Sequence, residues 1–254
     1  MKILQLGKFY PIRGGVEKVM YDLMTGLSER GVKCDMLCAA SEKEDVGEEQ
    51  INDDATLMCV RSLARVKATM ISPEMILKMR KIRNEYDILH VHHPDPMACL
   101  ALWLSGYKGK VALHWHSDIL KQKTLLKLYK PLQNWLINRA DVIIGTTPVY
   151  LEASPWLKDV QDKTVALPIG VVPLEINEAA AADVRKQYEG KKIIFSLGRL
   201  VPYKGFKYLI DSARYLDDSY VVLIGGGGPL EESLQQRIAD SGLQDRVKLL
   251  GFLT

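Results

Sequence analysis

Short apolar segments alternate with longer segments of helical periodicity along almost all 254 residues of the chain. The first repeat runs from an apolar segment at Lys2–Phe9, through a helical pattern that stops at Gly31, to a second apolar segment at Val32–Ala39. Two strands that a helix joins lie parallel, because a parallel pair needs a long crossover connection. The repeated unit therefore predicts an α/β fold with a parallel sheet covered by helices on both faces.

The alternation is interrupted once, at Pro168, Gly170 and Pro173, and then starts again. Before the interruption we expect a helix that Ser72-Pro73-Glu74 opens and helices at 94–104, 123–140 and 147–157. We expect strands at Lys2–Phe9, Val32–Ala39, Asp87–His92, Lys110–Trp115, Asp141–Thr146 and Lys163–Leu167, and a further apolar segment at Ala55–Val60. After it we expect helices at Glu178–Tyr188, Gly205–Leu216 and Pro229–Asp240, and strands at Lys191–Leu197, Tyr220–Ile224 and Arg246–Leu250. The pattern thus divides the chain into two parts, residues 1–168 and 169–254.

Composition argues against several classes of protein. Hydrophobic residues make up 47% of the chain, which is too many for a disordered protein, and no apolar run reaches the ~20 residues that span a bilayer. The formal net charge of +3 does not indicate a nucleic-acid partner. The four cysteines form no C-x-x-C pair, so we interpret them as buried free thiols of a cytoplasmic protein rather than as zinc ligands.

Gly14 and Gly15 stand between the first predicted strand and the first predicted helix. Glycines at a helix N-terminus let a phosphate group approach free backbone N–H groups, although a tight turn explains them equally well. The G-x-G-x-x-G fingerprint is not matched here, which disfavours a nicotinamide-dependent dehydrogenase, and the chain has no G-x-x-x-x-G-K-[ST] motif.

Histidines gather at the ends of two neighbouring predicted strands, with His90, His92 and His93 at one end and His114 and His116 at the other. Such a group could hold a metal ion, but it more often lines a polar cleft, and no H-E-x-x-H motif accompanies it. We therefore expect no metal. His116 is the functional candidate, because it follows its strand directly and precedes Ser117-Asp118.

Two turns in the second part follow neighbouring strands. Arg199 and Lys204 flank the first turn, and Gly225–Gly228 form the second. Two cations beside a helix N-terminus suit a diphosphate, and glycines let a nucleotide lie against the backbone. Ordinary surface charge is the alternative for the cations. Two phosphate-binding turns at adjacent strand ends of one sheet are stronger evidence than either turn alone.

The excess positive charge lies in the first part, in the stretches 61–83 and 119–140. The second stretch contains no acidic residue and includes Lys121, Lys123, Lys127 and Lys130. A solvated basic face above an ordinary core-facing apolar stripe explains both stretches. The functional alternative is docking on an anionic membrane or on a phosphate-bearing lipid.

Six short motifs are spread over nearly the whole chain: Gly14-Gly15-Val16-Glu17-Lys18, Asp141-Val142-Ile143-Ile144, the Leu167–Val171 hinge, Gly198-Arg199-Leu200 with Lys204-Gly205, Ile224-Gly225 with Gly228-Pro229, and Val247–Gly251. Together they resemble glycosyltransferase family 4, the retaining enzymes of GT-B fold. Phe9-Tyr10-Pro11 and the stretch 114–118 look most like bacterial mannosyl- or rhamnosyltransferases of O-antigen and capsule assembly.

The resemblance implies two Rossmann-like domains that face a cleft. Residues 1–168 would bind the acceptor, with Gly14 and Gly15 bordering the donor diphosphate and the acceptor. His116 would hydrogen-bond the transferred sugar.

The second domain, residues 169–254, would bind the nucleotide sugar. Arg199 and Lys204 would hold the diphosphate and stabilise the charge on the leaving group, so that neither a metal nor a cofactor is implied. Gly226 and Gly228 would lie under the nucleotide.

The implied activity is transfer of a hexose, with mannose favoured, from a nucleoside diphosphate sugar to a saccharide or a polyprenyl-diphosphate-linked acceptor. The anomeric configuration would be retained, and the product would enter a cell-surface polysaccharide. We expect the protein in the cytoplasm or on the inner face of the cell membrane. A nucleotide-sugar 2-epimerase of GT-B fold and a non-catalytic binding fragment are the alternatives.

The chain departs from the family pattern at two places. The E-x7-E motif of the family should lie beyond the Val247–Gly251 strand, which is near the last residue of this chain. The usual Pro-Asn-Gly-Val-Asp hinge is replaced by Pro168-Ile169-Gly170-Val171-Val172. We therefore expect a truncated form whose second domain is incomplete and which shows little transferase activity.

Overall fold

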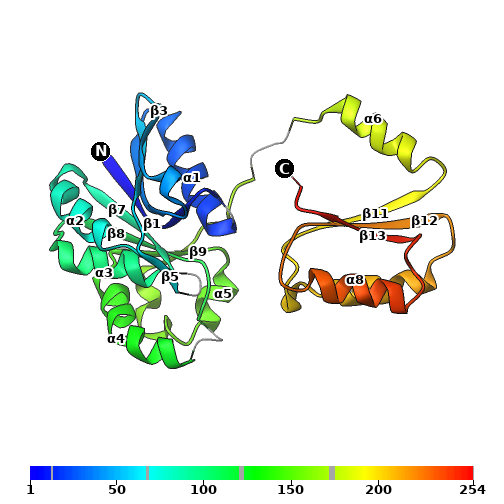
Figure 1. Cartoon of the computed structure of the whole chain (residues 1–254). Coiled ribbons are helices and arrows are strands. Elements are labelled where there is room, and N and C mark those ends of the chain that lie inside the picture. Colours follow the sequence, from blue (N-terminus) through cyan, green and yellow to red (C-terminus); the bar gives the residue numbers. More distant parts are fainter. Residues whose placement is uncertain (13, 67–68, 120–122, 172–174, 254) are drawn as a thin grey trace. The chain divides into compact units, whose positions relative to one another are not determined.

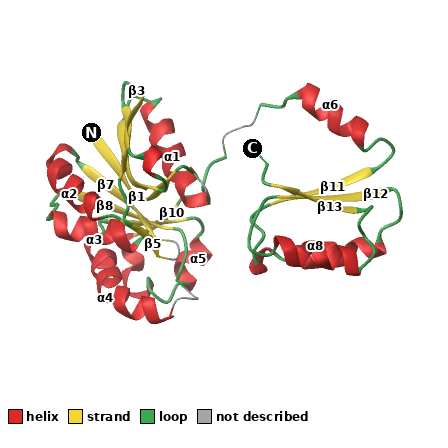
Figure 2. Ribbon diagram, viewed as in Figure 1, coloured by secondary structure: helices red, strands yellow, loops and turns green. Residues whose placement is uncertain are grey.

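The computed structural model describes residues 1–12, 14–66, 69–119, 123–171 and 175–253, with the backbone alone for 123–125. The chain forms two compact units, an N-terminal unit of Met1–Val171 and a C-terminal unit of Val172–Thr254. Each unit has its own sheet and its own core (Figures 1 and 2). Within the described residues, no helix is both long enough and apolar enough to cross a bilayer.

The N-terminal unit is built around an eight-stranded sheet with the strand order β10-β9-β8-β7-β1-β2-β4-β3. Its elements in chain order are β1 (Lys2–Tyr10), α1 (Gly15–Ser28), β2 (Lys33–Ala40), β3 (Gly47–Asn52), β4 (Ala55–Val60), β5 (Ala64–Val66), β6 (Thr69–Ile71), α2 (Pro73–Ile82), β7 (Ile88–His93), α3 (Pro96–Ser105), β8 (Lys110–Trp115), α4 (Lys123–Arg139), β9 (Val142–Gly145), α5 (Pro148–Ala153) and β10 (Thr164–Ala166). The side chain of Ser72 caps α2 by accepting a hydrogen bond from the backbone N–H of Met75, as the sequence predicts.

The sheet is parallel except at one edge. Strand β3 pairs antiparallel with β4, and β5 and β6 form a separate short antiparallel hairpin. The sequence analysis missed these three strands, while the parallel sheet that it predicted is confirmed for the other strands of the unit. Strand β3 exposes Glu48, Glu49 and Gln50 to solvent, so it lacks the apolar pattern by which the other strands are recognised. Charges on an edge strand also prevent pairing with other chains.

Helices cover the N-terminal sheet on both faces. Neighbouring residues of one strand point to opposite faces, so Ile3 joins the core beneath α1 while Leu4 joins the larger core beneath α2, α3 and α4. All four cysteines are buried free thiols, which confirms the prediction from sequence. Cys38 and Cys59 face each other on β2 and β4 with their Sγ atoms 3.4 Å apart.

The strand order reverses direction between β1 and β7, which lie side by side in the middle of the sheet. In open α/β sheets, ligands bind outside the carboxyl ends of the strands at such a switch point. The turns that follow β1 and β7 are therefore where a site is expected in this unit.

The C-terminal unit has a smaller sheet of three parallel strands in the order β11-β12-β13. Its elements are α6 (Glu178–Gln187), β11 (Lys192–Leu197), α7 (Phe206–Ser212), β12 (Tyr220–Gly225), α8 (Glu231–Asp240) and β13 (Val247–Gly251). Helices α7 and α8 pack on one face and form the core of the unit. On the other face Phe195 is 55% and Leu197 62% exposed, and α6 buries none of its residues.

Candidate functional site

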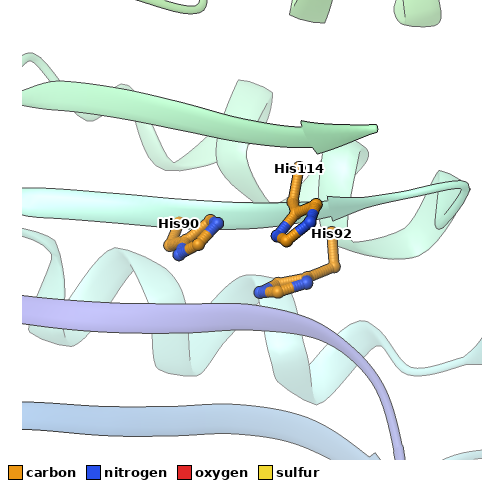
Figure 3. A group of neighbouring side chains, drawn as sticks. All are labelled: His90, His92 and His114. Carbon is orange, nitrogen blue, oxygen red and sulfur yellow. The ribbon is translucent and has the colours of Figure 1, made fainter. Parts of the chain in front are cut away.

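Four histidines lie on one face of the N-terminal sheet, beside the switch point. His90 and His92 are two residues apart on β7, which places them on the same face, and the strand register sets His92 opposite His114 of β8. His116 follows β8 and continues the same face (Figure 3 shows the first three). His93 points to the other face, where its ring stacks on Trp115 at 3.7 Å between centroids.

A chain of hydrogen bonds fixes the orientation of His116. The Nε2 atom of His92 lies 2.7 Å from Gln5 Oε1, and its Nδ1 atom lies 2.9 Å from His116 Nε2. An amide oxygen only accepts, so His92 carries its proton on Nε2 and donates to Gln5. Its Nδ1 atom then accepts from His116 Nε2–H. His116 is left with an unprotonated Nδ1 that can accept a hydrogen bond from a hydroxyl group.

Burial keeps these imidazoles neutral, because removal from water disfavours the charged form. It lowers the pKa of His90 to about 3, of His114 to about 4 and of His116 to about 2, and it holds the pKa of His92 well below its ordinary value. Neutral imidazoles act as hydrogen-bond partners or ligands rather than as charges at physiological pH.

The turn after β1 is tied to the turn after β7. Lys8 has a positive φ of 55°, its backbone N–H donates to Asp95 Oδ2, and its side-chain amine donates to the carbonyl of Pro94. The other oxygen of Asp95 caps α3 by accepting from the backbone N–H of Met97 at 2.9 Å. These bonds hold two neighbouring strand ends of the switch point together.

Gly14 and Gly15 are exposed at the start of α1, where Gly14 is the N-cap and Gly15 the first helical residue. A Cβ atom at Gly14 would lie 2.5 Å from a carboxylate oxygen of Glu17, whereas one at Gly15 would meet nothing within 4 Å. Glu17 is buried, and burial raises its pKa against the opposing charge of Lys8. Gly14 therefore leaves room for an acidic side chain at the first turn of the helix.

Asp118 holds the loop beside His116 by accepting side-chain hydrogen bonds. Its Oδ1 atom accepts hydrogen bonds from Trp115 Nε1 at 2.8 Å and from Ser154 Oγ at 2.9 Å. Through these contacts, the loop that contains His116 is anchored to Ser154, the residue that follows α5.

The sequence analysis missed Gln5, Lys8 and Asp95 as parts of this region, and it named Glu17 in the Gly14–Lys18 motif without giving it a role. Gln5 is detectable as the one uncharged polar residue inside an apolar strand, and Asp95 as an N-cap residue before Pro96. Lys8 carries no comparable pattern, because its role depends on contacts with Asp95 and Pro94, which are distant in sequence.

Arg199 and Lys204 lie in the turn between β11 and α7. Both side chains are exposed, and in the described part of the chain neither forms an ion pair. The amine of Lys204 lies 5.9 Å from the ring centroid of Tyr203. The turn thus presents two cations to solvent at the carboxyl end of a parallel strand.

The glycine turn after β12 packs directly against the turn that carries Arg199. The backbone N–H of Gly198 donates to the carbonyl of Gly225, and that of Leu200 to the carbonyl of Gly227, both at 3.0 Å. The structure therefore brings both predicted phosphate-binding turns side by side in one unit.

Close backbone packing requires Gly226 and Gly228 to be glycines. A Cβ atom would lie 2.2 Å from the carbonyl oxygen of Gly198 at the first position and 2.6 Å from that of Leu200 at the second. The φ of +117° at Gly226 is also unfavourable for other residues. Sequence reasoning attributed these glycines to a nucleotide alone.

The basic residues of the second stretch belong to α4 and to the segment before it. Lys127 and Lys130 are exposed, and Leu128 between them is 80% exposed. Lys121 and the side chain of Lys123 lie outside the described residues.

The first basic stretch is largely engaged within the unit. Lys78 forms an ion pair with Glu48, and the guanidinium groups of Arg80 and Arg83 donate to the carbonyls of Leu104 and Ser105. In α4, the amine of Lys130 lies 5.7 Å from the centroid of the Trp156 ring, and Arg139 forms an ion pair with Asp141.

Comparison with known proteins gives two family matches that together span most of the chain. Residues 13–171 match the model of Glycosyltransferase Family 4, and residues 178–254 match the model of glycosyl transferases group 1. The chain is similar to the O-antigen chain mannosyltransferase C of Escherichia coli, with 30% identity over 97% of this chain and 66% of that protein. It is also similar to the D-rhamnosyltransferase WbpZ of Pseudomonas aeruginosa, with 27% identity over 99% of this chain and 66% of that protein. The chain thus spans slightly less than two thirds of the length of these relatives.

Solved structures share the fold of the whole chain. Anabaena Alr3699/HepE in complex with UDP-glucose has a TM-score of 0.73 at 19% identity and covers all of this chain and 70% of its own. The sucrose-phosphate synthase of Thermosynechococcus elongatus has a TM-score of 0.71 at 17% identity, over all of this chain and 71% of its own. This likeness confirms the predicted fold class, with two Rossmann-like units of GT-B type.

Proposed function

The chain belongs to glycosyltransferase family 4, and we propose that it takes part in transferring a hexose, with mannose favoured, from a nucleoside diphosphate sugar to a saccharide acceptor. The observation that carries this proposal is the pair of adjoining turns in the C-terminal unit, one with Arg199 and Lys204 and one made of glycines. The names of the mannosyltransferase and rhamnosyltransferase relatives support a role in O-antigen synthesis.

In this proposal, Arg199 and Lys204 bind the donor diphosphate. Both side chains are exposed and without ion pairs among the described residues, so binding a diphosphate breaks no existing bridge. Charge-assisted hydrogen bonds to the phosphate oxygens strengthen as the glycosyl bond breaks and negative charge develops on the leaving group. This charge stabilisation does the work that a metal ion does in other transferases, and no cofactor is needed. Gly226 and Gly228 lie under the nucleotide.

His116 contacts the transferred sugar. Its free Nδ1 accepts a hydrogen bond from a sugar hydroxyl, because the chain through His92 and Gln5 places its proton on Nε2. Gly14 and Gly15 border the diphosphate and the acceptor, where a side chain at the second position would project into open space.

The proposed reaction retains the anomeric configuration by attack from the face that the diphosphate leaves. The acceptor oxygen forms a bond to the anomeric carbon while the bond from that carbon to the phosphate oxygen breaks. The proton of the acceptor hydroxyl passes to the departing phosphate, which leaves as the nucleoside diphosphate.

The acceptor in this proposal is linked to a polyprenyl diphosphate at the inner face of the cell membrane, and the protein works from the cytoplasm. Lys127 and Lys130 support membrane contact because they flank an exposed leucine on α4. The proposal also includes Lys121 and Lys123 on the ground of the sequence alone. A lysine close to an anionic membrane contributes ~1 kcal/mol of attraction.

A screen of the chain against a panel of nucleoside diphosphate sugars, with and without saccharide acceptors, tests the proposal. We expect binding of one nucleotide sugar and, where turnover occurs, labelled sugar attached to the acceptor. A free epimerised sugar would instead support a 2-epimerase of the same fold. Binding to no member of the panel by the folded chain would contradict the proposal.

A further inference from the structure

Three buried histidines offer their ring nitrogens to a common point in the N-terminal unit. His90, His92 and His114 are 8%, 0% and 3% exposed, and one nitrogen of each lies within 4.8 Å of one nitrogen of both others. Figure 3 shows a nitrogen of His90 and one of His114 turned toward each other across a space that the ring of His92 borders. Four of the five histidines of the chain belong to this face of the sheet.

Several of these nitrogens lack hydrogen-bond partners in the described part of the chain. They are Nε2 of His90 and both ring nitrogens of His114, and each is shielded from solvent. A buried polar atom without a partner costs free energy, and a group that binds to it recovers that cost. A neutral imidazole carries one N–H and one lone pair, so at least one of the two nitrogens of His114 offers a lone pair that no group of the described residues meets. A metal cation can bind such a lone pair.

We propose that His90, His92 and His114 together bind one divalent transition-metal cation, for which Zn²⁺ is the reference ion. Neutral imidazole is a standard ligand of Zn²⁺ at ~2.0–2.1 Å, and a site with three protein ligands leaves a fourth position open. Two nitrogens that bind one tetrahedral zinc ion lie roughly 3.4 Å apart. Side-chain rotation closes the difference from the present spacing.

The rings now lie with their planes 6° to 29° apart. Binding requires them to turn about the Cβ–Cγ bond until the lone pairs, which lie in the ring planes, meet at one point. His92 gives up one of its two hydrogen bonds, to Gln5 or to His116, when it becomes a ligand. His90 and His114 gain a partner without losing one.

The donor set predicts which ions bind. Imidazole nitrogens without carboxylates suit Zn²⁺, Ni²⁺ and Cu²⁺, whereas Mg²⁺ and Ca²⁺ prefer oxygen ligands. The site contains neither Arg199 nor Lys204, so it is separate from the cations that the proposed transfer reaction uses.

Calorimetric titration of the untagged full chain with Zn²⁺, after treatment with a chelator, tests the proposal. We expect one zinc ion per chain and no binding of Mg²⁺. His114→Phe keeps a ring in the cluster but removes both nitrogens, and it should weaken zinc binding by at least ~100-fold, the upper end of the loss caused by removing outer-sphere partners. His93→Phe is the matched control, because it changes a buried histidine on the opposite face of β7 and should leave the affinity unchanged.

Circular dichroism and thermal melting without metal show whether each variant folds. If His114→Phe does not fold, His90→Phe is used in its place. Absorption of the Co²⁺ form should show nitrogen ligation and no thiolate charge-transfer band. Such a band would assign the metal to the Cys38–Cys59 pair and overturn the proposal. Failure of the folded chain to bind Zn²⁺, or an affinity in the folded His90→Phe or His114→Phe variant equal to that of the unchanged chain, would overturn it as well.

Discussion

The two units of the chain use opposite means to present polar groups. The N-terminal unit covers an eight-stranded sheet on both faces and keeps its histidines largely shielded from water and neutral. The C-terminal unit covers a three-stranded sheet on one face and presents Arg199 and Lys204 to solvent. Polar groups of the first unit are therefore fixed by packing, whereas those of the second are free to meet a charged ligand.

This difference can be measured separately in the two units. All four tryptophans, at positions 103, 115, 135 and 156, belong to the N-terminal unit. Tryptophan fluorescence therefore reports the unfolding of that unit alone, while circular dichroism reports both. The histidines are distributed in the same way, since all five lie in the N-terminal unit.

Acid should produce the largest difference in stability between the two units. Burial lowers the pKa of all five histidines in the folded state, so the unfolded chain binds more protons below its own histidine pKa of about 6.5. Their contribution to the free energy of unfolding is complete above that pH. It is lost as the pH falls below it, by about 1.4 kcal/mol per histidine and per pH unit. Denaturant unfolding in the presence of a chelator, followed by tryptophan fluorescence between pH 7 and pH 5, should show this loss. A free energy of unfolding that stays constant over the range would contradict it.

Substitutions in the two sheets should show the effect of covering one face or both faces. Leu89 is fully buried on β7, and Leu89→Ala should lower the free energy of unfolding of the N-terminal unit by about 2–5 kcal/mol through the cavity it leaves. Phe195 occupies a strand of the C-terminal sheet but is 55% exposed, so Phe195→Ala should change stability by no more than about 0.5 kcal/mol. Equal losses in the two variants would show that the open face of the small sheet is covered in solution.

The glycine turns give a smaller contrast. Gly226→Ala forces a Cβ atom against the carbonyl of Gly198 and should destabilise the C-terminal unit by about 1–3 kcal/mol. Gly15→Ala places its Cβ in open space at the start of α1 and serves as the control. Thermal melting followed by circular dichroism compares them, and similar melting temperatures would refute the close backbone packing after β12.

The proposed membrane contact has the smallest expected effect. Replacing Lys127 and Lys130 by Glu should weaken binding to anionic vesicles by about 1 kcal/mol per lysine removed. High salt should also weaken it, because the Debye length falls to ~3 Å at 1 M. Lys207→Glu in the C-terminal unit is the control for a change of charge alone. Co-sedimentation that is equal with neutral and anionic vesicles would exclude an electrostatic contact.

The sequence predicts most of the fold because apolar strands end at residues that break them. Lys110–Trp115 is predicted with its observed bounds, the apolar segment Ala55–Val60 coincides with β4, and each of the other predicted strands differs by one residue at one or both ends. Strand β3 is missed because its burial is low and its pattern is acidic. A strand that contributes little to the core leaves little trace in the periodicity of hydrophobic residues.

The site can be predicted from sequence only for residues whose role follows from their position next to a predicted strand. His116, Arg199 and Lys204 follow strands directly and can be found by that rule. Gln5 acts on His116 through His92, and this relation needs the register of β1 against β7. The packing reason for Gly226 is equally hidden, because it depends on contact with a turn almost thirty residues earlier.

Calorimetry of nucleoside diphosphate binding to Arg199→Ala and Lys204→Ala tests the central claim most directly. Each change removes a charge-assisted contact, so each should weaken binding by about 1.5–3 kcal/mol. Lys207→Ala is the matched control, because it removes an exposed cation from the same unit outside the two adjoining turns. The account predicts a large loss in the first two variants and none in the third. Unchanged affinity in both Arg199→Ala and Lys204→Ala would contradict the assignment of the donor diphosphate to this turn.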